Sequence, residues 1–348
     1  MTISVSSVSK YFYSHAALDG VSINIEKGEF FVVLGPSGCG KSTLLRSIAG
    51  LETIDGGEIH LAGHHVAGKG THVPPEKRNV GVVFQSYALW PHMSVSGNVA
   101  FPLETARLAK NDIAAQTRNC LERVELLPYA DRKPADLSGG QRQRVALARC
   151  LAQGAQTVLM DEPLANLDPH LRHAMEEELS DFHRATGATT LFITHDQREA
   201  MALADRVALM WDGKVLQVDH PHRLYSKPKN ERVASFIGRG SLVDVVVKKA
   251  DRGLALIAFS GVHVPVRCAE NASEGDGQLL IRPEQIVVSP DGDGISGRVA
   301  RVTYRGGFWE VHVQLNASQP AVLVNTSRRV TEGDKVSLRI EDAWLLPE

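Results

Sequence analysis

The sequence has 348 residues, a formal net charge of -2, 43% hydrophobic residues and 22% charged residues. This length predicts two domains, and the hydrophobic content with a small net charge excludes a disordered chain. The near-neutral charge also argues against nucleic acid as the main partner, because nucleic-acid binding usually requires a basic face. We therefore expect a folded protein with no nucleic acid partner.

Cysteine use and hydropathy limit the cellular setting. The four cysteines are scattered without metal-ligand spacing, which predicts reduced thiols at Cys39, Cys120, Cys150 and Cys268. The first residues, MTISVSSVSKYFY, lack a basic start followed by an apolar core, so we do not expect a signal peptide. No apolar stretch approaches the roughly 20 residues that span a bilayer. A role at a membrane would therefore depend on membrane partners.

The chain up to about residue 237 alternates strands and helices. The first 30 residues show short strands, in which apolar residues alternate with polar ones. The continuous run FFVVL at 30–34 precedes a glycine-rich turn and predicts a buried strand of a parallel sheet. Similar apolar runs predict strands at 80–84, 157–160, 189–193 and 206–210, and helical patterns predict helices at 42–51, 111–127, 141–153, 170–186 and 196–204. This order predicts an α/β domain with a mostly parallel sheet.

The remainder of the chain, from about residue 238, loses helical periodicity. Glycine-rich turns at 274–277 and 291–294 separate short runs of alternating apolar residues. We expect strands at 242–248, 254–259, 263–267, 279–282, 285–288, 297–304, 309–315 and 335–340. This pattern predicts a small β-barrel or sandwich. The expected domains are therefore 1–237 and 238–348.

A phosphate-binding loop follows the strand at 30–34. The stretch GPSGCGKST matches the pattern GxxxxGK[ST] between a buried strand and a helix. Glycines let backbone N–H groups wrap around a phosphate, and the helix N-terminus favours the anion. Lys41 can reach the β- and γ-phosphates, the Ser42 hydroxyl can ligate Mg²⁺, and Cys39 is expected only to fill space. The predicted phosphate-binding residues are Gly35, Pro36, Ser37, Gly38, Cys39, Gly40, Lys41, Ser42 and Thr43.

Two carboxylates end the apolar strand at 157–160. In enzymes with such a phosphate-binding loop, the first carboxylate, here Asp161, holds Mg²⁺, usually through water. The second, Glu162, is placed to orient or deprotonate the attacking water. Acidic residues at strand ends are commonly only solvated, but the upstream loop makes the catalytic interpretation the stronger one.

A second glycine-rich motif precedes the acidic strand. Residues 137–141 read LSGGQ and are followed by RQRVALARCLA. Ser138, Gly139 and Gly140 would expose backbone donors at a helix N-terminus and so form a second phosphate-binding surface, with Gln141 next to it. One chain does not need two such surfaces for one phosphate.

The LSGGQ motif resembles the signature of the ATP-binding-cassette (ABC) ATPase family, and the resemblance covers residues 1 to about 237. It implies a P-loop NTPase fold of the ABC type, with a helical subdomain at about 86–156. It also implies ATP hydrolysis with ATP and Mg²⁺ as cofactors. Two subunits would pack head to tail, so that each signature closes on the ATP of the other subunit.

The resemblance also assigns roles to single residues. Phe12 matches the aromatic residue that stacks on adenine, although Tyr11 and Tyr13 leave the register open. Gln85 matches a glutamine that touches Mg²⁺ and senses the membrane partner, and His195 matches a histidine that contacts the γ-phosphate. The implied catalytic residues are Glu162, His195, Lys41 and Gln85. The implied Mg²⁺ ligands are Ser42, Gln85 and Asp161.

The loop at 164–168, LANLD, resembles the family loop that couples the two nucleotide sites across the dimer. Asp168 is its implied nucleotide-site residue, and Ala165 stands where family members often have serine. The segment Tyr87–His92 is expected to contact the coupling helix of a membrane subunit, although its aromatic and apolar residues could instead be ordinary core.

The second domain resembles the regulatory OB-like β-barrel of importer ATPases, through IRPEQIVV at 281–288 and VARVTYRGGFWEVHV at 299–313. This resemblance implies a homodimer beneath two transmembrane permease subunits, with a periplasmic solute-binding protein. The chain would lie at the cytoplasmic face of the inner membrane. The β domain would bind a regulator or extend the dimer interface.

Length and the compact second domain favour ferric iron as the solute, and leave polyamine, phosphonate, thiamine and sugar open. The alternatives to an importer are an exporter subunit, a non-transport ABC ATPase and a module that no longer hydrolyses ATP. The absence of a long coiled coil and of a second cassette argues against repair and translation proteins. The intact catalytic residues argue against an inactive module.

Overall fold

The computed structural model describes residues 2–165, 167–289, 294–316 and 319–347. The chain divides into two compact units, Met1–Pro221 and His222–Glu348. The second unit therefore begins before the expected boundary at 237/238 and includes two short helices that were not predicted, α7 (Pro221–Ser226) and α8 (Glu231–Phe236). Among the described residues, no helix combines the length and the apolarity needed to cross a bilayer.

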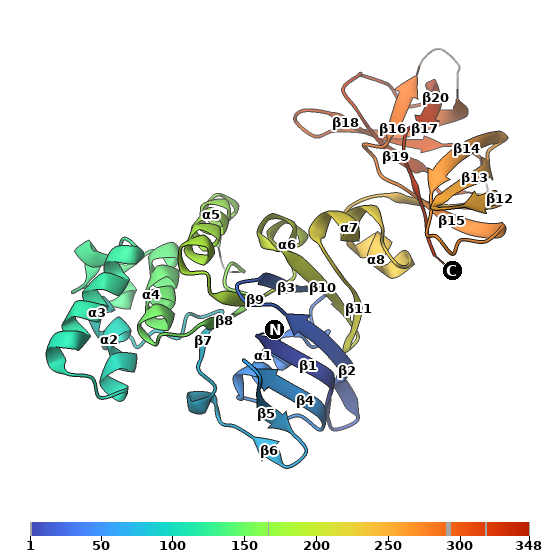
Figure 1. The fold of residues 1–348 in the computed structure, drawn as a ribbon. Helices are drawn as coiled ribbons and strands as arrows, with labels where there is room; N and C mark the ends of the chain where they lie inside the picture. The colour runs from blue at the N-terminus through green and yellow to red at the C-terminus, as the bar shows by residue number, and fades with distance from the viewer. Residues whose placement is uncertain (1, 166, 290–293, 317–318, 348) are drawn as a thin grey trace. The chain divides into compact units, whose positions relative to one another are not determined.

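A six-stranded sheet forms the centre of the first unit (Figure 1). Its order is β11-β10-β3-β9-β8-β7, and all neighbours are parallel except β10 and β11. All five residues of β3 are buried, as expected for a central strand of a parallel sheet. The predicted α/β fold is therefore confirmed. The strands are β3 (Phe30–Leu34), β7 (Val80–Val83), β8 (Thr157–Asp161), β9 (Thr189–Thr194), β10 (Arg206–Trp211) and β11 (Lys214–Asp219).

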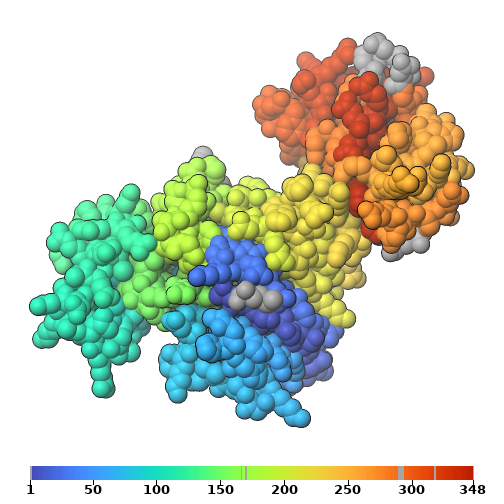
Figure 2. All heavy atoms as spheres, in the orientation of Figure 1, coloured from blue at the N-terminus to red at the C-terminus, as the bar shows by residue number. Residues whose placement is uncertain are grey.

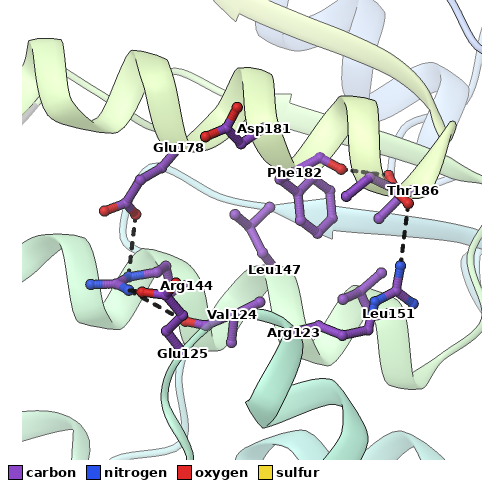
Figure 3. Close-up of a pocket in the computed structure, with 11 residues that line it drawn as sticks. Arg123, Val124, Glu125, Arg144, Leu147, Leu151, Glu178, Asp181, Phe182 and Thr186 are labelled. Carbon is purple, nitrogen blue, oxygen red and sulfur yellow. Dashed lines mark hydrogen bonds and ion pairs between the residues drawn. The ribbon is translucent and has the colours of Figure 1, made fainter.

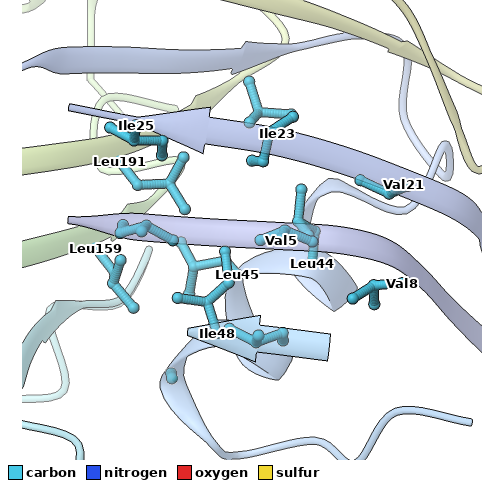
Figure 4. Packing of buried hydrophobic residues seen from close by; sticks show 14 of the residues in the cluster. Val5, Val8, Val21, Ile23, Ile25, Leu44, Leu45, Ile48, Leu159 and Leu191 are labelled. Atoms are coloured by element: carbon cyan, nitrogen blue, oxygen red, sulfur yellow. The ribbon is translucent and has the colours of Figure 1, made fainter. Parts of the chain in front are cut away.

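A second, antiparallel sheet of the first unit has the order β2-β1-β4-β5-β6. Its strands are β1 (Ile3–Phe12), β2 (His15–Ile25), β4 (Gly56–Leu61), β5 (His64–Gly68) and β6 (Thr71–His72). Helix α1 (Lys41–Ala49) joins the two sheets into one core, in which Leu44, Leu45 and Ile48 pack with side chains of both sheets (Figure 4). This packing sets the position of the helix that begins at the phosphate-binding loop.

Three helices between β7 and β8 form a separate group, α2 (Val95–Thr105), α3 (Lys110–Arg123) and α4 (Gly139–Ala152) (Figure 1). Helix α2 was not predicted, because it contains the poor helix formers Gly97 and Pro102. Ser94 stabilises its first turn by accepting a hydrogen bond from the Gly97 N–H. Short 3₁₀ turns lie at Pro75–Lys77, Leu127–Tyr129 and Pro134–Asp136, and α5 (Pro169–Thr186) and α6 (Gln197–Leu203) follow β8 and β9.

The second unit is all-β after α8, as predicted, and contains a closed barrel of order β12-β13-β14-β21-β15. The second unit also contains a five-stranded sheet of order β16-β20-β17-β18-β19. The sequence did not predict this sheet as a separate layer. The strands are β12 (Ser241–Asp251), β13 (Leu254–Phe259), β14 (Val262–Arg267), β15 (Gly275–Ile281), β16 (Ile286–Ser289), β17 (Ile295–Tyr304), β18 (Trp309–Gln314), β19 (Val322–Thr326), β20 (Lys335–Ile340) and β21 (Trp344–Leu345). Of the turn expected at 291–294, residues 291–293 lie outside the described residues.

A buried arginine joins the short helices to the barrel within the second unit. Arg282 follows β15, is 1% exposed and stacks on the ring of Tyr225, 4.1 Å from its centroid. Its guanidinium donates to the backbone carbonyls of Tyr225 at 2.9 Å, Arg239 at 3.1 Å and Ala234 at 3.3 Å. These carbonyls belong to α7, α8 and the segment after them. The two helices are therefore bound to the β strands of the second unit through Arg282.

Candidate nucleotide-binding site

The predicted site residues follow four neighbouring strands at the same edge of the central sheet. In the register, Leu34 of β3 pairs with Thr194 of β9, Ile193 pairs with Asp161 of β8, and Met160 pairs with Val83 of β7. Directly after three of these strand ends come the phosphate-binding loop, Glu162 and His195, and Gln85 follows β7 with only Phe84 between them. Ligands of open α/β sheets bind outside the carboxyl ends of the strands, which is where these residues meet.

The phosphate-binding loop is closed in by backbone on two sides. A Cβ on Gly35 would lie 2.1 Å from the Met210 carbonyl oxygen, and a Cβ on Gly40 would lie 2.1 Å from the Ala17 carbonyl oxygen. Gly40 also has φ of 101°, a conformation that side-chain-bearing residues rarely adopt. Strands β10 and β2 thus hold the loop in one shape, and only glycine fits at both positions.

Lys41 lies inside this loop rather than in solvent. Its side chain is 4% exposed, and its ammonium donates to the carbonyls of Gly35 at 2.8 Å and Pro36 at 2.9 Å. The ammonium therefore lies beside the first turn of α1, where the helix dipole also favours negative charge. A positive centre enclosed by glycine backbone fits a bound phosphate.

Two oxygen groups meet beside the loop. The Ser42 hydroxyl donates to Asp161 Oδ1 at 2.8 Å, although the two residues are far apart in sequence, and Asp161 is buried. Gln85 is exposed at the same sheet edge. Hydroxyl, carboxylate and amide oxygens are the ligands that Mg²⁺ prefers, so these residues fit the predicted metal role.

Glu162 and His195 form a pair at the next strand ends. His195 Nδ1 lies 3.1 Å from Glu162 Oε2. Glu162 has φ of 46°, and its N–H donates to the Ile193 carbonyl at 3.1 Å. Such a left-handed backbone is costly for a non-glycine residue and is often found at functional sites. The contact fixes the position of the carboxylate; the sequence identified both residues but not their pairing.

The signature residues start helix α4. Ser138 Oγ accepts from the Gln141 N–H at 3.3 Å, and Gln141 Oε1 accepts from the Ser138 N–H at 3.0 Å, which is a capping box. A Cβ on Gly140 would lie 2.7 Å from Met175 Sδ, so α4 approaches α5 closely. Figure 1 shows α4 grouped with α2 and α3 rather than with α1, so the signature and the phosphate-binding loop are separate surfaces of the chain.

The aromatic residues near the loop are all exposed. Tyr11 is 48% exposed, Phe12 is 42% exposed and Tyr13 is fully exposed. Their strands reach the phosphate-binding loop through Ala17, against which Gly40 packs. Any of the three rings can therefore stack on a base, and the register stays open.

The loop that follows Glu162 caps the next helix. Asp168 Oδ1 accepts from the Leu171 N–H at 3.0 Å at the start of α5. Ala165 donates its N–H to the Glu162 carbonyl at 3.3 Å. Asn166, part of the predicted coupling loop, lies outside the described residues.

Cys39 is buried within the phosphate-binding loop, and burial raises the pKa of its thiol. A thiol that resists ionisation is a poor nucleophile, which agrees with the predicted space-filling role. The other three cysteines are free and buried as well.

The segment after Gln85 is tied to the signature helix by a residue that sequence patterns did not reveal. Arg149 of α4 donates to the carbonyls of Ala88 at 2.8 Å and Tyr87 at 3.0 Å, and its guanidinium lies 5.1 Å from the centroid of the Trp90 ring. Tyr87 itself is buried, and its hydroxyl donates to the Pro163 carbonyl at 3.3 Å. The Tyr87 side chain is thus internal and links this segment to the residue after Glu162.

A cavity of about 350 Å³ lies apart from these residues, between α4 and α5 (Figure 3). Arg144 of α4 crosses it to Glu178 of α5 at 3.2 Å and donates to the Val124 carbonyl at 3.4 Å. Arg123 donates to the Ala185 carbonyl at 3.5 Å. The charged groups that line the cavity are already paired. The cavity is therefore part of the interface between α4 and α5 and not part of the nucleotide site.

Comparison with known proteins agrees with this geometry. A family model described as ABC transporter matches residues 18–165, and one described as TOBE domain matches residues 279–346. The spermidine/putrescine import ATP-binding protein PotA of Chromobacterium violaceum is 41% identical, over 98% of this chain and 96% of that protein. PotA of Pseudomonas aeruginosa is 42% identical, over 98% of this chain and 96% of that protein.

Two solved structures are similar to part of the chain. The cbiO1 protein of Clostridium perfringens, part of the ABC transporter complex cbiONQ, is 29% identical with a TM-score of 0.58, covering 64% of this chain and 90% of that chain. An ATP-binding cassette solved as a dimer with ADP and Pi is 30% identical with a TM-score of 0.54, covering 63% of this chain and 98% of that chain. The chain belongs to the ATP-binding subunits of ABC importers that carry a C-terminal TOBE domain. It binds ATP and is an ATPase.

Proposed function

We propose that this chain works as a head-to-tail homodimer that hydrolyses Mg²⁺-ATP beneath two membrane permease subunits to import a polyamine. The observation that carries the catalytic part is the arrangement at the sheet edge. The Ser42–Asp161 contact at 2.8 Å and the Glu162–His195 contact at 3.1 Å follow neighbouring strands, beside the enclosed Lys41. Phosphoryl transfer to water requires a cation at the phosphates, oxygen ligands for the metal ion and a carboxylate in a fixed position.

The residues of the site would divide the work as follows. Bound Mg²⁺ supplies positive charge to the phosphates, and Ser42, Asp161 and Gln85 would hold it. Lys41 would exchange its loop carbonyls for phosphate oxygens and neutralise their charge. Glu162 would orient a water molecule and accept its proton, while His195 keeps the carboxylate turned toward the site. The signature of a second copy would supply the backbone donors at the N-terminus of α4.

A surface groove supports the proposed membrane partner. It has a volume of about 620 Å³, lies between α2 and α3, and is lined in part by Ser96, Ala100, Ile113 and Leu121. Ser94, which caps α2, also lines it and follows shortly after the segment Tyr87–His92. Charged residues, Glu104, Lys110, Arg118 and Asp131, also line the groove. A groove of mixed apolar and charged lining near this segment suits a short amphipathic helix of a permease subunit. Of that segment, Ala88, Pro91 and His92 are exposed, whereas Tyr87 is not available for contact.

The names of the relatives indicate which solute the transporter imports. Those named above are spermidine/putrescine import proteins, and the same name recurs in relatives from Nitrosospira multiformis and Thermotoga maritima. These names favour the polyamine alternative and give no support to ferric iron, which length and the compact second domain had favoured. Length was a weak guide because the ATPase subunit does not contact the solute in this kind of transporter.

The proposed setting follows from the partners. The chain would lie at the cytoplasmic face of the inner membrane, with a periplasmic solute-binding protein on the other side. The TOBE-containing unit would extend the dimer interface or bind a regulator.

Glu162→Gln tests the catalytic assignment. Hydrolysis should fall by about 10²–10⁴ because the amide cannot take the proton, while ATP binding persists. Phosphate release gives the rate, and size-exclusion chromatography with ATP should show a stable dimer. Hydrolysis close to that of the unaltered chain would contradict the role of Glu162, and an ATP-loaded monomer would contradict the head-to-tail arrangement.

Isolation of the native complex from membranes tests the partners and the solute. Two permease subunits and a binding protein should co-purify, and the binding protein should bind spermidine or putrescine in a calorimetric screen that includes Fe³⁺, thiamine and sugars. Recovery of the ATPase with ribosomes or DNA would contradict the transport role.

A further inference from the structure

Two histidines on the antiparallel sheet of the first unit lie outside the nucleotide site. His60 of β4 and His65 of β5 are directly opposed in the strand register. Their ring centroids lie 5.0 Å apart, with 32° between the ring planes. Directly opposed residues of antiparallel strands share one face of the sheet. That face is toward solvent, because Ile59 and Leu61, the neighbours of His60, are buried on the other face.

The spacing of the two rings matches what a shared metal ion requires. Imidazole nitrogen binds Zn²⁺ at about 2.0–2.1 Å, which places the ring centroid about 3.2 Å from the ion. For angles of about 90–109° at the metal, two such centroids lie about 4.5–5.2 Å apart. The separation of 5.0 Å between His60 and His65 falls within this interval.

The surroundings of His65 leave room for its ring and add negative charge. A Cβ on Gly68 would lie 2.4 Å from His65 Nε2 and 3.4 Å from Glu58 Cγ. The Nε2 edge of the ring therefore rests against Gly68, where any side chain would displace it, which leaves Nδ1 as the nitrogen of His65 that can bind a metal, and Glu58 flanks the ring. Glu58 and His60 are two residues apart on β4 and share the solvent face. A carboxylate beside two imidazoles favours a bound cation.

We propose that His60 and His65 together bind one divalent transition-metal ion of the kind that imidazole prefers, Zn²⁺, Ni²⁺ or Cu²⁺. In the part of the chain that the structure describes, no group of three or more His, Cys, Asp or Glu residues is arranged to hold a metal. The proposed site has two protein ligands, and water would complete the coordination. Mg²⁺ prefers oxygen ligands and belongs to the nucleotide site. The light-blue segment that contains β4 to β6 lies at the surface of the first unit in Figure 2.

Calorimetric titration of Ni²⁺ and Zn²⁺ into the untagged, nucleotide-free, full-length chain tests the site. One equivalent of metal should bind saturably, and His60→Ala or His65→Ala should each lower the affinity at least about tenfold. His64→Ala is the matched control: His64 is exposed and adjacent, but it pairs with the buried-face residue Leu61 and points away from the pair. It should leave the affinity unchanged. The buried cysteines should not compete.

Electron paramagnetic resonance of bound Cu²⁺ gives a second readout, because nitrogen splitting reports the number of imidazole ligands. The unaltered chain should show two, and His65→Ala should show one. Unfolding temperatures without metal establish that each variant is folded. The proposal is overturned if the unaltered chain shows no saturable site, or if His65→Ala binds metal as tightly as the unaltered chain does.

Discussion

Each unit buries a cationic side chain among backbone carbonyls, but the two cations are enclosed to different degrees. In the first unit, Lys41 donates to two carbonyls of its own loop. In the second, Arg282 donates to three carbonyls from separate segments, those of Tyr225, Ala234 and Arg239, and an aromatic ring covers one of its faces. An ammonium has three donors and a guanidinium has five in a fixed plane.

This difference distinguishes Lys41, which can bind a ligand, from Arg282, which stabilises the fold. The acceptors of Lys41 lie in a glycine-rich loop at a helix N-terminus, where an anion can compete for the ammonium. The acceptors of Arg282 are carbonyls of α7, α8 and the segment after α8, and they fix these elements to the strand that precedes Arg282. Burial of a cation is therefore not by itself a sign of a ligand site. The segments that supply its hydrogen-bond acceptors show whether a ligand can take their place.

Among the substitutions that test this comparison, Lys41→Ala is expected to have the largest effect. Loss of the ammonium should reduce ATP hydrolysis by about 10²–10³, because the phosphates lose their main cationic contact from this chain. Phosphate release and nucleotide affinity measure the effect. Thermal unfolding of the second unit should not change. Arg282→Met serves as the control for ATP binding, which it should leave intact; equal loss of hydrolysis in both variants would contradict the comparison.

Arg282→Met should mainly destabilise the second unit. Three buried carbonyls would lose their donor, at a cost of about 3–5 kcal/mol in the free energy of unfolding. Urea unfolding measures this loss when it is monitored through Trp344 of the barrel in a chain whose other tryptophans, Trp90, Trp211 and Trp309, are replaced by Phe. Arg282→Lys should recover only part of the loss, because an ammonium cannot reproduce the planar fork. An unchanged unfolding midpoint would show that the carbonyls find other partners.

Arg149→Ala is expected to have a smaller effect, because its acceptors, the carbonyls of Tyr87 and Ala88, lie in a partly exposed segment. The free energy of unfolding should fall by about 1–2 kcal/mol, and hydrolysis should fall less than in Lys41→Ala, because the segment after Gln85 loses its tie to the signature helix. Arg118→Ala is the control, since its pair with Glu122 is exposed. Equal effects of both substitutions would exclude a special role for Arg149.

The smallest expected effect is on the rate of alkylation of the Cys39 thiol. Because burial raises its thiol pKa, the thiolate fraction at neutral pH should lie below that of a free cysteine, and alkylation should be slow and accelerate as the pH rises above the usual cysteine range. Cys150, whose pKa is raised to about 11, should react more slowly still. Mass spectrometry of peptides after iodoacetamide treatment measures both rates. ATP should protect Cys39 but not Cys150, and equal protection would argue against a bound nucleotide at the loop.

Much of the nucleotide site could be predicted from sequence because its parts are local. The loop around Lys41, the pair Asp161–Glu162 and the position of His195 each follow an apolar strand, and parallel strands bring their carboxyl ends to one edge. Helix α2 was missed because Gly97 and Pro102 weaken its local pattern, and tertiary packing overrides that weakness. Strand β21 was missed because it has only two residues and pairs with β14 and β15, which lie far from it in the sequence. Strand β19 was missed although it pairs with the preceding strand, β18.

The sequence by itself determined the α/β class, the phosphate-binding loop, the signature and the all-β character of the second unit, because each depends on periodicity or on contiguous residues. Only the tertiary structure decided which polar groups meet: Glu162 with His195, Arg149 with the segment after Gln85, and Arg282 with α7 and α8. Such contacts join residues that are distant in sequence. They form only when folding brings a donor and its acceptors from separate segments within reach, and no local pattern records that geometry.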